Sequence, residues 1–239
     1  MSSSGCKLIV FDLDGTLLDT GRGISKCIAS TLGKMGFEVP DEETCKTFVG
    51  PPLKKRFLEL FDADEKTADA VMKTFRDEYG NGDVFLADHY AGMDECLAAL
   101  RKYYALAVAT YKREDHAKQL LEKFGMDQYF DVICGSDAAA AMTKNQIVAT
   151  AAERLDVPLA DCVMVGDSDN DAIAAEQLGM QFIGVTYGYG FKSEADVAKY
   201  PHVACANSPM QLQTALDPSA QPLIVIARSV ATKQSIKEL

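Results

Sequence analysis

Two aspartates that follow the first apolar segment of the chain are the residues that most clearly suggest chemistry. Residues 7–11 read Lys-Leu-Ile-Val-Phe, and Asp12, Asp14 and Gly15 come next. A short apolar run that ends in acids is typical of a buried parallel strand with functional groups at its carboxyl end. Residues two apart in an extended chain point to the same side. Because unpaired charges beside a core are costly, the pair favours a metal-assisted phosphoryl site over a solvated strand end.

A second cluster of acids follows a later apolar segment, residues 162–165. The next six residues read Gly-Asp-Ser-Asp-Asn-Asp, which breaks the strand and places Asp167 and Asp171 just beyond its end. Taken alone, Asp171 could equally be a helix N-cap. Ligands of parallel sheets bind at the carboxyl ends of the strands, so we expect the two acidic clusters to share one site.

Two further polar residues occupy comparable positions between these clusters. Thr110 ends the apolar segment that begins at Tyr104, and Lys144 opens a helical stripe of apolar residues. Alone, each has an ordinary interpretation, Thr110 as a strand-end residue and Lys144 as a solvated cation. A cation at a helix start, however, opposes the helix dipole. Together with the acids, a hydroxyl and an ammonium group could hold phosphoryl oxygens.

The spacing of apolar residues predicts the elements that position these groups. After residue 86, helices alternate with strands expected at 104–111, 130–135, 162–165 and 182–186, with a weak strand at 202–205. Repeated strand–helix units predict an α/β fold, a doubly wound parallel sheet with helices on both faces.

The stretch between the first two polar clusters reads differently. Apolar residues recur there at helical spacing, without a convincing strand, and a Gly-Pro-Pro turn at 50–52 interrupts the helices. We therefore expect an α/β core at 1–19 and 86–216, a small helical domain at 20–85, and a linker-like appendage at 217–239.

Composition bounds the partners. The 239 residues carry a net charge of −11, which argues against a nucleic-acid polymer as partner but permits a small phosphorylated metabolite beside a metal ion. The seven cysteines form no C-x-x-C pair, and no apolar run resembles a signal peptide or a membrane span. We expect a cytoplasmic protein without a membrane partner, and a monomer or weak homodimer by default.

In chain order, these polar groups resemble the four motifs of the haloacid dehalogenase superfamily. The resemblance runs from about residue 7 to 216, and its motifs are Asp-Leu-Asp-Gly-Thr from Asp12, a strand-ending Thr110, Lys144 at a helix start, and Gly-Asp-x-x-x-Asp through Asp171. It implies a Rossmann-like core of that superfamily's type.

The resemblance also implies roles for the acids. Asp12 would be the nucleophile that forms an aspartyl-phosphate, and Asp14 would act as general acid and then base. Mg²⁺ would be held by the carboxylates of Asp12 and Asp167 and by the backbone carbonyl of Asp14. Asp171 would be a further metal ligand or a support for one.

Phosphate binding is expected, on the same resemblance, from Thr110, Tyr111, Lys144 and nearby backbone N–H groups. The related subgroup usually has Ser or Asn where this chain has Tyr111. The residues ahead of Lys144, 138–142, are also less polar than is usual. Both departures could reshape a substrate pocket.

The helical segment between the first two motifs is similar to the C1 cap of phosphoglycolate-phosphatase-like members. Its Phe-Val-Gly-Pro-Pro-Leu sequence, residues 48–53, resembles a cap loop of proteins described as phosphoglycolate phosphatases or 5′-nucleotidases. Gly50, Pro51, Pro52 and Arg56 are therefore candidate substrate or cap residues. A solvated basic helix turn is an equally good interpretation of Arg56 and its neighbours.

The second acid separates branches of the superfamily. Where this chain has Asp14, dehalogenases carry Tyr and phosphonatases carry Ala, so the resemblance implies a phosphatase or a phosphomutase. We expect a Mg²⁺-dependent phosphatase that acts on a small phosphorylated metabolite, with a 5′-nucleotide or phosphoglycolate as leading candidates. The alternatives are a sugar phosphomutase similar to β-phosphoglucomutase and a non-catalytic binding protein of the same fold. Retention of the acids and Lys144 argues against the last.

Overall fold

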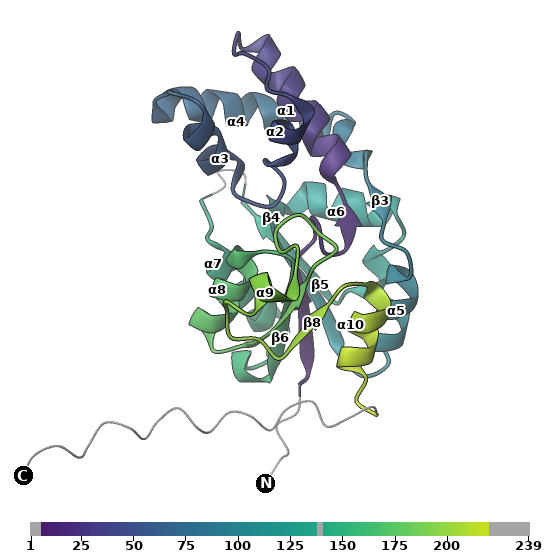
Figure 1. Cartoon of the computed structure of the whole chain (residues 1–239). Helices are drawn as coiled ribbons and strands as arrows, with labels where there is room; N and C mark the ends of the chain where they lie inside the picture. The colour runs from purple at the N-terminus through teal and green to yellow at the C-terminus, as the bar shows by residue number, and fades with distance from the viewer. Residues whose placement is uncertain (1–5, 138–140, 220–239) are drawn as a thin grey trace, which may run out of the picture.

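A six-stranded parallel sheet forms the centre of the molecule (Figure 1). The computed structural model describes residues 6–137 and 141–219, and the strands lie in the order β5–β4–β1–β6–β7–β8. Their bounds are β1 Leu8–Phe11, β4 Ala105–Arg113, β5 Val132–Ser136, β6 Cys162–Gly166, β7 Gln181–Val185 and β8 Ala204–Ala206. The predicted doubly wound α/β fold is confirmed, and the weak strand expected at 202–205 is the edge strand β8.

Strand β1 lies between β4 and β6 and is buried on both faces. Leu8 and Val10 pack into one hydrophobic cluster, whereas Ile9 and Phe11 pack into the other. The first cluster is shared with helices α7 (Lys144–Arg154), α8 (Asp169–Leu178) and α9 (Glu194–Val197). The second is shared with helices α5 (Met93–Leu100), α6 (Glu114–Lys123) and α10 (Pro209–Leu216). Because both faces of β1 are core, its first carboxylate, Asp12, can come only where the strand ends.

A helical segment stands beyond one end of the sheet (Figure 1). It comprises α1 Gly21–Lys34, α2 Glu42–Lys46, α3 Leu53–Leu60 and α4 Glu65–Gly80, followed by the 3₁₀ turn Asp83–Phe85. Where the chain leaves and rejoins the core, β2 (Leu18–Asp19) pairs antiparallel with β3 (Asp88–His89). The sequence pattern predicts no such ribbon, because two residues a strand are too few to show alternation. The division into a core and a separate helical domain stays a prediction.

Strand β4 is longer than its sequence suggests. It runs to Arg113, and its pairing with β5 becomes irregular after Thr110. The expectation that Thr110 ends the strand is therefore wrong. The physical reason is that the charge of Lys112 is buried and paired with Asp14, so this lysine can lie within the strand and does not end it.

Parts of two predicted segments lie outside the described residues. Of the appendage expected at 217–239, the part from 220 lies outside the described residues, as do 138–140 of the loop ahead of Lys144. Within the ranges that the structure describes, no helix is both long and apolar enough to cross a membrane. All seven cysteines are free thiols.

Candidate active site

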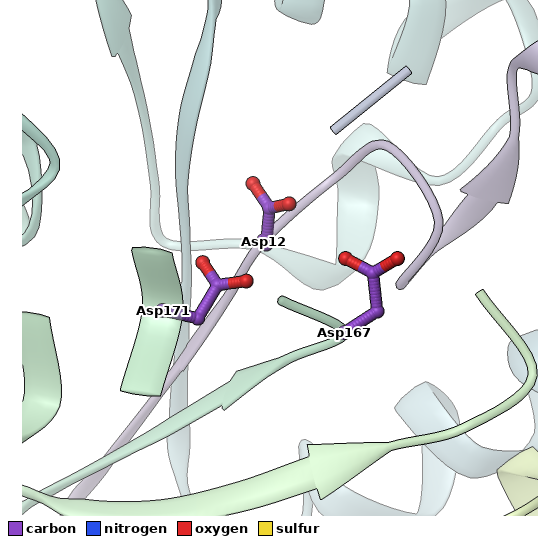
Figure 2. A group of neighbouring side chains, drawn as sticks. All are labelled: Asp12, Asp167 and Asp171. Carbon is purple, nitrogen blue, oxygen red and sulfur yellow. The ribbon is translucent and has the colours of Figure 1, made fainter. Parts of the chain in front are cut away.

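Three aspartates from distant parts of the sequence meet at the carboxyl edge of the sheet (Figure 2). Asp12 follows β1, Asp167 follows β6, and Asp171 lies in the first turn of α8. Oxygens of the three carboxylates lie within 4.8 Å of one another, and all three residues are buried. The predicted convergence of the two acidic clusters is thus present in the fold.

Two positions beside these acids have no room for a side chain and are therefore glycines. Gly15 has a φ of +86°, and a Cβ there would lie 2.4 Å from Oδ2 of Asp167. A Cβ on Gly166 would lie 2.3 Å from Cγ of Asp171. Only a residue without a side chain fits so close to a carboxylate, so both glycines of the motifs allow the acids to gather.

Lys144 is buried among the acids. Its Nζ lies 2.7 Å from Oδ1 of Asp12 and 2.8 Å from Oδ1 of Asp171. Its position at the start of α7 is set by Thr143, whose hydroxyl caps the helix in a reciprocal bond pair with Gln146. The ion pairs outweigh the unfavourable helix dipole, which is the reason that a cation stands at this helix start.

Asp167 is oriented by the loop that follows β7. Its Oδ2 accepts the backbone N–H groups of Tyr189 at 2.6 Å and Gly190 at 3.1 Å. Its Oδ1 is buried and has no hydrogen-bond partner among the described residues. A bare carboxylate oxygen at the centre of an acidic cluster is what a metal ligand requires.

The charges of the cluster fit a divalent cation. Asp12, Asp167 and Asp171 carry three negative charges when ionised, against one positive charge on Lys144, which leaves two uncompensated. Three carboxylates are also the hard oxygen donors that Mg²⁺ prefers. These residues therefore fit a magnesium ion.

Burial opposes ionisation of these carboxyl groups. Burial raises the pKa of Asp12, although the ammonium of Lys144 partly offsets the effect. Burial, and then the charge of Asp171, raise the pKa of Asp167 to about 6. A bound cation would favour the charged forms and lower both pKa values.

Asp171 both supports the start of α8 and faces Lys144. Its Oδ2 accepts the backbone N–H of Ser168 at 3.2 Å and the hydroxyl at 2.7 Å, so it belongs to the capping box of α8. Its Oδ1 faces Lys144. Asp171 is the third residue of the helix and Ser168 is the N-cap, so Asp171 is not itself the N-cap.

Asp14 is not one of the three clustered aspartates. Its Oδ1 accepts the hydroxyl of Thr20 at 2.7 Å and lies 2.9 Å from Nζ of Lys112. Lys112 in turn donates to the phenol oxygen of Tyr79 at 3.0 Å. Sequence reasoning did not identify Thr20, Lys112 or Tyr79. The available signal was that Lys112 stands two residues beyond Thr110, which in a strand places both on one side.

The other phosphate-binding candidates, Thr110 and Tyr111, lie in the second half of β4. Thr110 is buried, and its hydroxyl accepts the backbone N–H of Lys112 at 3.2 Å. The phenol oxygen of Tyr111 accepts the backbone N–H of Lys144 at 3.1 Å. Tyr111 thus contacts the lysine that pairs with Asp12, a contact that the Ser or Asn usual at this position is too short to make.

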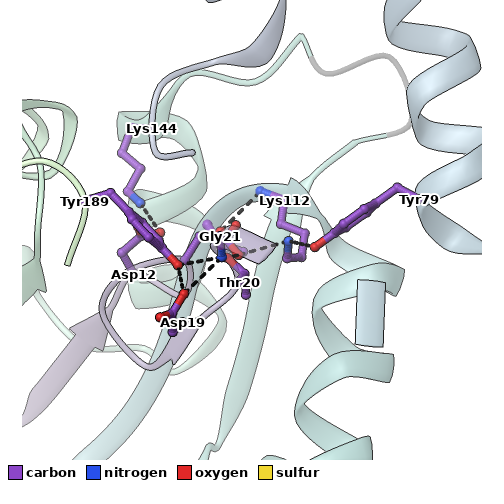
Figure 3. Close-up of polar contacts among 10 residues, drawn as sticks. Asp12, Asp19, Thr20, Gly21, Tyr79, Lys112, Lys144 and Tyr189 are labelled. Carbon is purple, nitrogen blue, oxygen red and sulfur yellow. Dashed lines mark hydrogen bonds and ion pairs between the residues drawn. The ribbon is translucent and has the colours of Figure 1, made fainter. Parts of the chain in front are cut away.

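Tyr189 was also not identified from sequence. Its phenol group hydrogen-bonds to Asp19 and accepts the backbone N–H of Gly21 at 2.6 Å (Figure 3). The residue whose backbone orients Asp167 therefore also holds the start of α1. The local signal was the glycine-rich stretch 184–190, in which glycines stand on either side of Tyr189.

A cavity of about 510 Å³ lies between the core and the helical segment. Gly50, Pro51 and Pro52 contribute to its wall, together with Asp14, but Arg56 does not. The cavity is otherwise lined mainly by apolar and cationic residues, among them Ile24, Phe48, Leu53, Met72, Phe75, Tyr79, Tyr111, Lys112, Arg113 and Met142.

Arg56 instead contacts other parts of the helical segment. Its Nε donates to the hydroxyl of Thr47 at 3.0 Å, and a terminal nitrogen lies 3.1 Å from the carboxylate of Glu59. The structure therefore brings three of the four candidate cap residues to the cavity and gives the fourth a local structural contact.

Comparison with known proteins places this geometry in a family. The model of the haloacid dehalogenase-like hydrolases matches residues 9–185. A 5′-nucleotidase of Pseudomonas aeruginosa is 30% identical over 201 residues, which cover 83% of this chain and 90% of that protein. A phosphoglycolate phosphatase of Neisseria meningitidis is 33% identical over 194 residues, or 76% of this chain and 81% of that protein.

A solved structure agrees with these relatives. The structure of a predicted phosphatase from Clostridium acetobutylicum is 36% identical, covers 88% of this chain and 97% of its own, and superposes with a TM-score of 0.82. The family match extends over both acidic clusters and over the polar residues between them. The chain belongs to the haloacid dehalogenase-like hydrolase family.

Proposed function

We propose that this hydrolase is a Mg²⁺-dependent phosphatase that cleaves a small phosphorylated metabolite through an aspartyl-phosphate on Asp12. The observation that carries the proposal is the buried cluster of Asp12, Asp167 and Asp171, with one lysine and a bare oxygen on Asp167. A phosphate monoester needs a nucleophile and neutralisation of its oxygens in one place. The cluster offers both.

In the first half-reaction, a carboxylate oxygen of Asp12 attacks the phosphorus, and the bond from phosphorus to the leaving oxygen breaks. Asp14 gives its proton to that oxygen, which leaves as an alcohol. In the second half-reaction, Asp14 takes a proton from water, the water oxygen bonds to phosphorus, and the bond to Asp12 breaks. Inorganic phosphate and free Asp12 result, so protons and bonds balance.

The metal ion would be held by Asp12, Asp167 and the backbone carbonyl of Asp14, with Asp171 as a further ligand or as support. When bound, it would neutralise charge on the phosphoryl oxygens. Lys144 supplies a second positive charge beside Asp12 from its buried position. Thr110, Tyr111 and nearby backbone N–H groups would complete phosphate binding, with Tyr111 acting through its contact to Lys144.

The helical segment, residues 20–85, would act as the cap over a core formed by 1–19 and 86–216, with 217–239 as an appendage. The cavity beside Asp14 supports this arrangement, because Gly50, Pro51 and Pro52 line it from the helical side. Closure of such a cap would exclude water from the reaction centre.

The cavity also bears on the substrate. Its 510 Å³ and its wall, which combines apolar side chains such as Phe48 and Phe75 with cationic ones such as Arg113, suit a leaving group that has an aromatic body and polar groups. A 5′-nucleotide is therefore our first candidate, and phosphoglycolate the second. The relatives named for these two activities support both.

The alternative activities and the partners are also part of the proposal. A sugar phosphomutase would need to retain a bisphosphate, and a non-catalytic binding protein would not need Asp12 beside Lys144. The net charge of −11 disfavours nucleic-acid polymers as partners. We propose a cytoplasmic location, no membrane partner, and a monomer or weak homodimer.

Phosphate release across a substrate panel tests the proposal. The panel contains nucleoside 5′-monophosphates, phosphoglycolate and hexose phosphates, each with Mg²⁺ and with EDTA, and Asp12→Asn as the blank. Release that needs Mg²⁺ and vanishes in the blank is expected. Borohydride reduction during turnover should convert residue 12 to homoserine, which mass spectrometry detects. No release from any substrate, with Mg²⁺ binding intact, would contradict the phosphatase.

A further inference from the structure

Lys112 is a buried cation for which the proposed chemistry has no role. It lies on β4, and its side chain is 5% exposed. Its Nζ is 2.9 Å from Oδ1 of Asp14, the proposed acid and base. Removal of a lysine from water is costly unless its charge is paired, so the contact with Asp14 is a specific one.

The second partner of Lys112 comes from the helical segment. Its Nζ donates to the phenol oxygen of Tyr79, in the last turn of α4, and lies 4.7 Å from the centre of that ring (Figure 3). Tyr79 is itself buried. The ammonium is therefore held between an acid of the core and an aromatic ring of the helical segment, where a cation–π contact adds to the hydrogen bond.

Thr20 holds the same oxygen of Asp14 from the other end of the helical segment. Thr20 is the N-cap of α1, yet its side chain makes no capping hydrogen bond. It donates to Oδ1 of Asp14 instead. The chain enters the helical segment after Thr20 and leaves it shortly after Tyr79, so both contacts to Oδ1 depend on where that segment lies.

We propose that Lys112, held by Tyr79, is a positioning residue for Asp14. With Oδ1 engaged by Thr20 and Lys112, the carboxylate keeps one orientation, and Oδ2 is the oxygen that meets the leaving group. The orientation exists only while the helical segment sits over the core. This inference rests on the proposed role of Asp14 as acid and base.

Leaving-group dependence separates positioning of the acid from a structural role. The readout is kcat/KM for the best alkyl phosphate of the panel divided by that for p-nitrophenyl phosphate, whose leaving group needs little protonation. Lys112→Met should lower the alkyl value roughly 10- to 100-fold and the nitrophenyl value about 3-fold at most. Lys118→Met is the matched control, because Lys118 pairs with Glu114 on an exposed helix face. It should leave both values unchanged.

Tyr79→Phe is a milder second variant. It removes the acceptor of the Lys112 hydrogen bond but keeps the ring, so the ratio should fall roughly 3- to 10-fold. Tyr103→Phe, at an exposed tyrosine, is its control. Lys112→Arg keeps the charge and should restore part of the ratio. In an Asp14→Asn background, Lys112→Met should not change the ratio further.

Each outcome of these measurements either supports or overturns the positioning role of Lys112. Equal losses on both substrates, or a wild-type ratio in Lys112→Met, would overturn the positioning role. A rise in KM for both substrates at constant kcat would also overturn it, in favour of direct substrate binding by Lys112. If Lys112→Met does not fold, as circular dichroism would show, the ratio in Tyr79→Phe decides. If the wild-type protein releases phosphate from neither substrate, the proposed function fails instead.

Discussion

The two aspartates at the end of β1 belong to regions of different construction. Asp12 lies among side chains at the ends of the sheet strands and at the starts of the helices that pack on the sheet, with Asp167 and Lys144 as neighbours. Asp14, two residues later, lies against Thr20 and Lys112 and lines a cavity shared with the helical segment. In the proposed function, the end of the site that would hold the phosphoryl group is thus set by the sheet and its helices, and the end that would face the leaving group is set by these and the helical segment together.

The difference follows from how each region is fixed. The backbone N–H of Asp12 donates to the carbonyl of Val165 at 2.9 Å, so the sheet itself sets the distance from Asp12 to the cluster beyond β6. Asp14 bridges to Leu18 in the turn that follows it, not to a neighbouring strand of the six-stranded sheet, and its carboxylate is held by the side chains of Thr20 and Lys112. If the proposed function holds, the residues around Asp12 would stay fixed by the sheet, whereas those around Asp14 could differ with the substrate.

Asp12→Asn should have the largest effect. Without the nucleophile, kcat should fall about 10⁴-fold or more on every substrate, alkyl or aryl, because the attacking group itself is lost. The measurement is phosphate release, with Mg²⁺-induced thermal stabilisation as the control for folding and metal binding. Residual activity of several per cent would remove Asp12 from the nucleophile role.

Asp14→Ala should show the asymmetry between the two regions. Loss of general acid catalysis should cost about 10²- to 10⁴-fold on an alkyl phosphate, because an alkoxide is a poor leaving group. The loss on p-nitrophenyl phosphate should be about tenfold smaller or less. Equal losses on both substrates would show that Asp14 does not act as the acid.

Asp167→Asn tests whether the buried charge of Asp167 destabilises the metal-free protein. The pKa of Asp167 is raised from 3.8 to about 6, so between these values the folded protein binds more protons than the unfolded chain. Stability of the metal-free protein should therefore fall as pH rises from about 4 to 6. At pH 7.5 the cost of the charged form is on the order of 3 kcal/mol.

Thermal unfolding in EDTA measures this effect. Metal-free Asp167→Asn should unfold at a higher temperature than the wild-type protein at pH 7.5, and at about the same temperature at pH 4. Addition of Mg²⁺ should raise the midpoint of the wild-type protein and leave that of the variant nearly unchanged. A metal-free variant less stable than wild type at pH 7.5 would contradict the assigned cause.

Arg56→Ala should have the smallest effect. Arg56 contacts Thr47 and Glu59 and does not line the cavity, so kcat/KM should change about threefold at most. Pro51→Ala, a change in the cavity wall, is the comparison and should alter KM more. A larger effect from Arg56→Ala would restore the residue to substrate binding, as the sequence pattern suggested.

The sequence was sufficient to predict the cluster around Asp12, because the signals for it are local. The apolar run 8–11, the paired acids after it, and the Gly-Asp pattern after β6 each record a strand end within a few residues. Parallel sheets place such ends at one edge, so convergence of Asp12, Asp167 and Asp171 follows from the order of elements. Gly15 and Gly166 also belong to local sequence patterns. The reason that they are glycines, the close approach of a carboxylate, is visible only in the tertiary structure.

Only the tertiary structure decided which side chains surround Asp14. Lys112 and Tyr79 lie 33 residues apart in sequence, on different elements, and neither has a type or spacing that predicts the other. Thr20 occupies the N-cap position of α1, but its hydroxyl donates to Asp14, and the backbone N–H of Gly23 that a cap could bind donates to the carbonyl of Leu86. Local sequence records how each element begins and ends. Which side chains meet between the sheet and the helical segment depends on how the two pack together. That packing exists only in the folded chain.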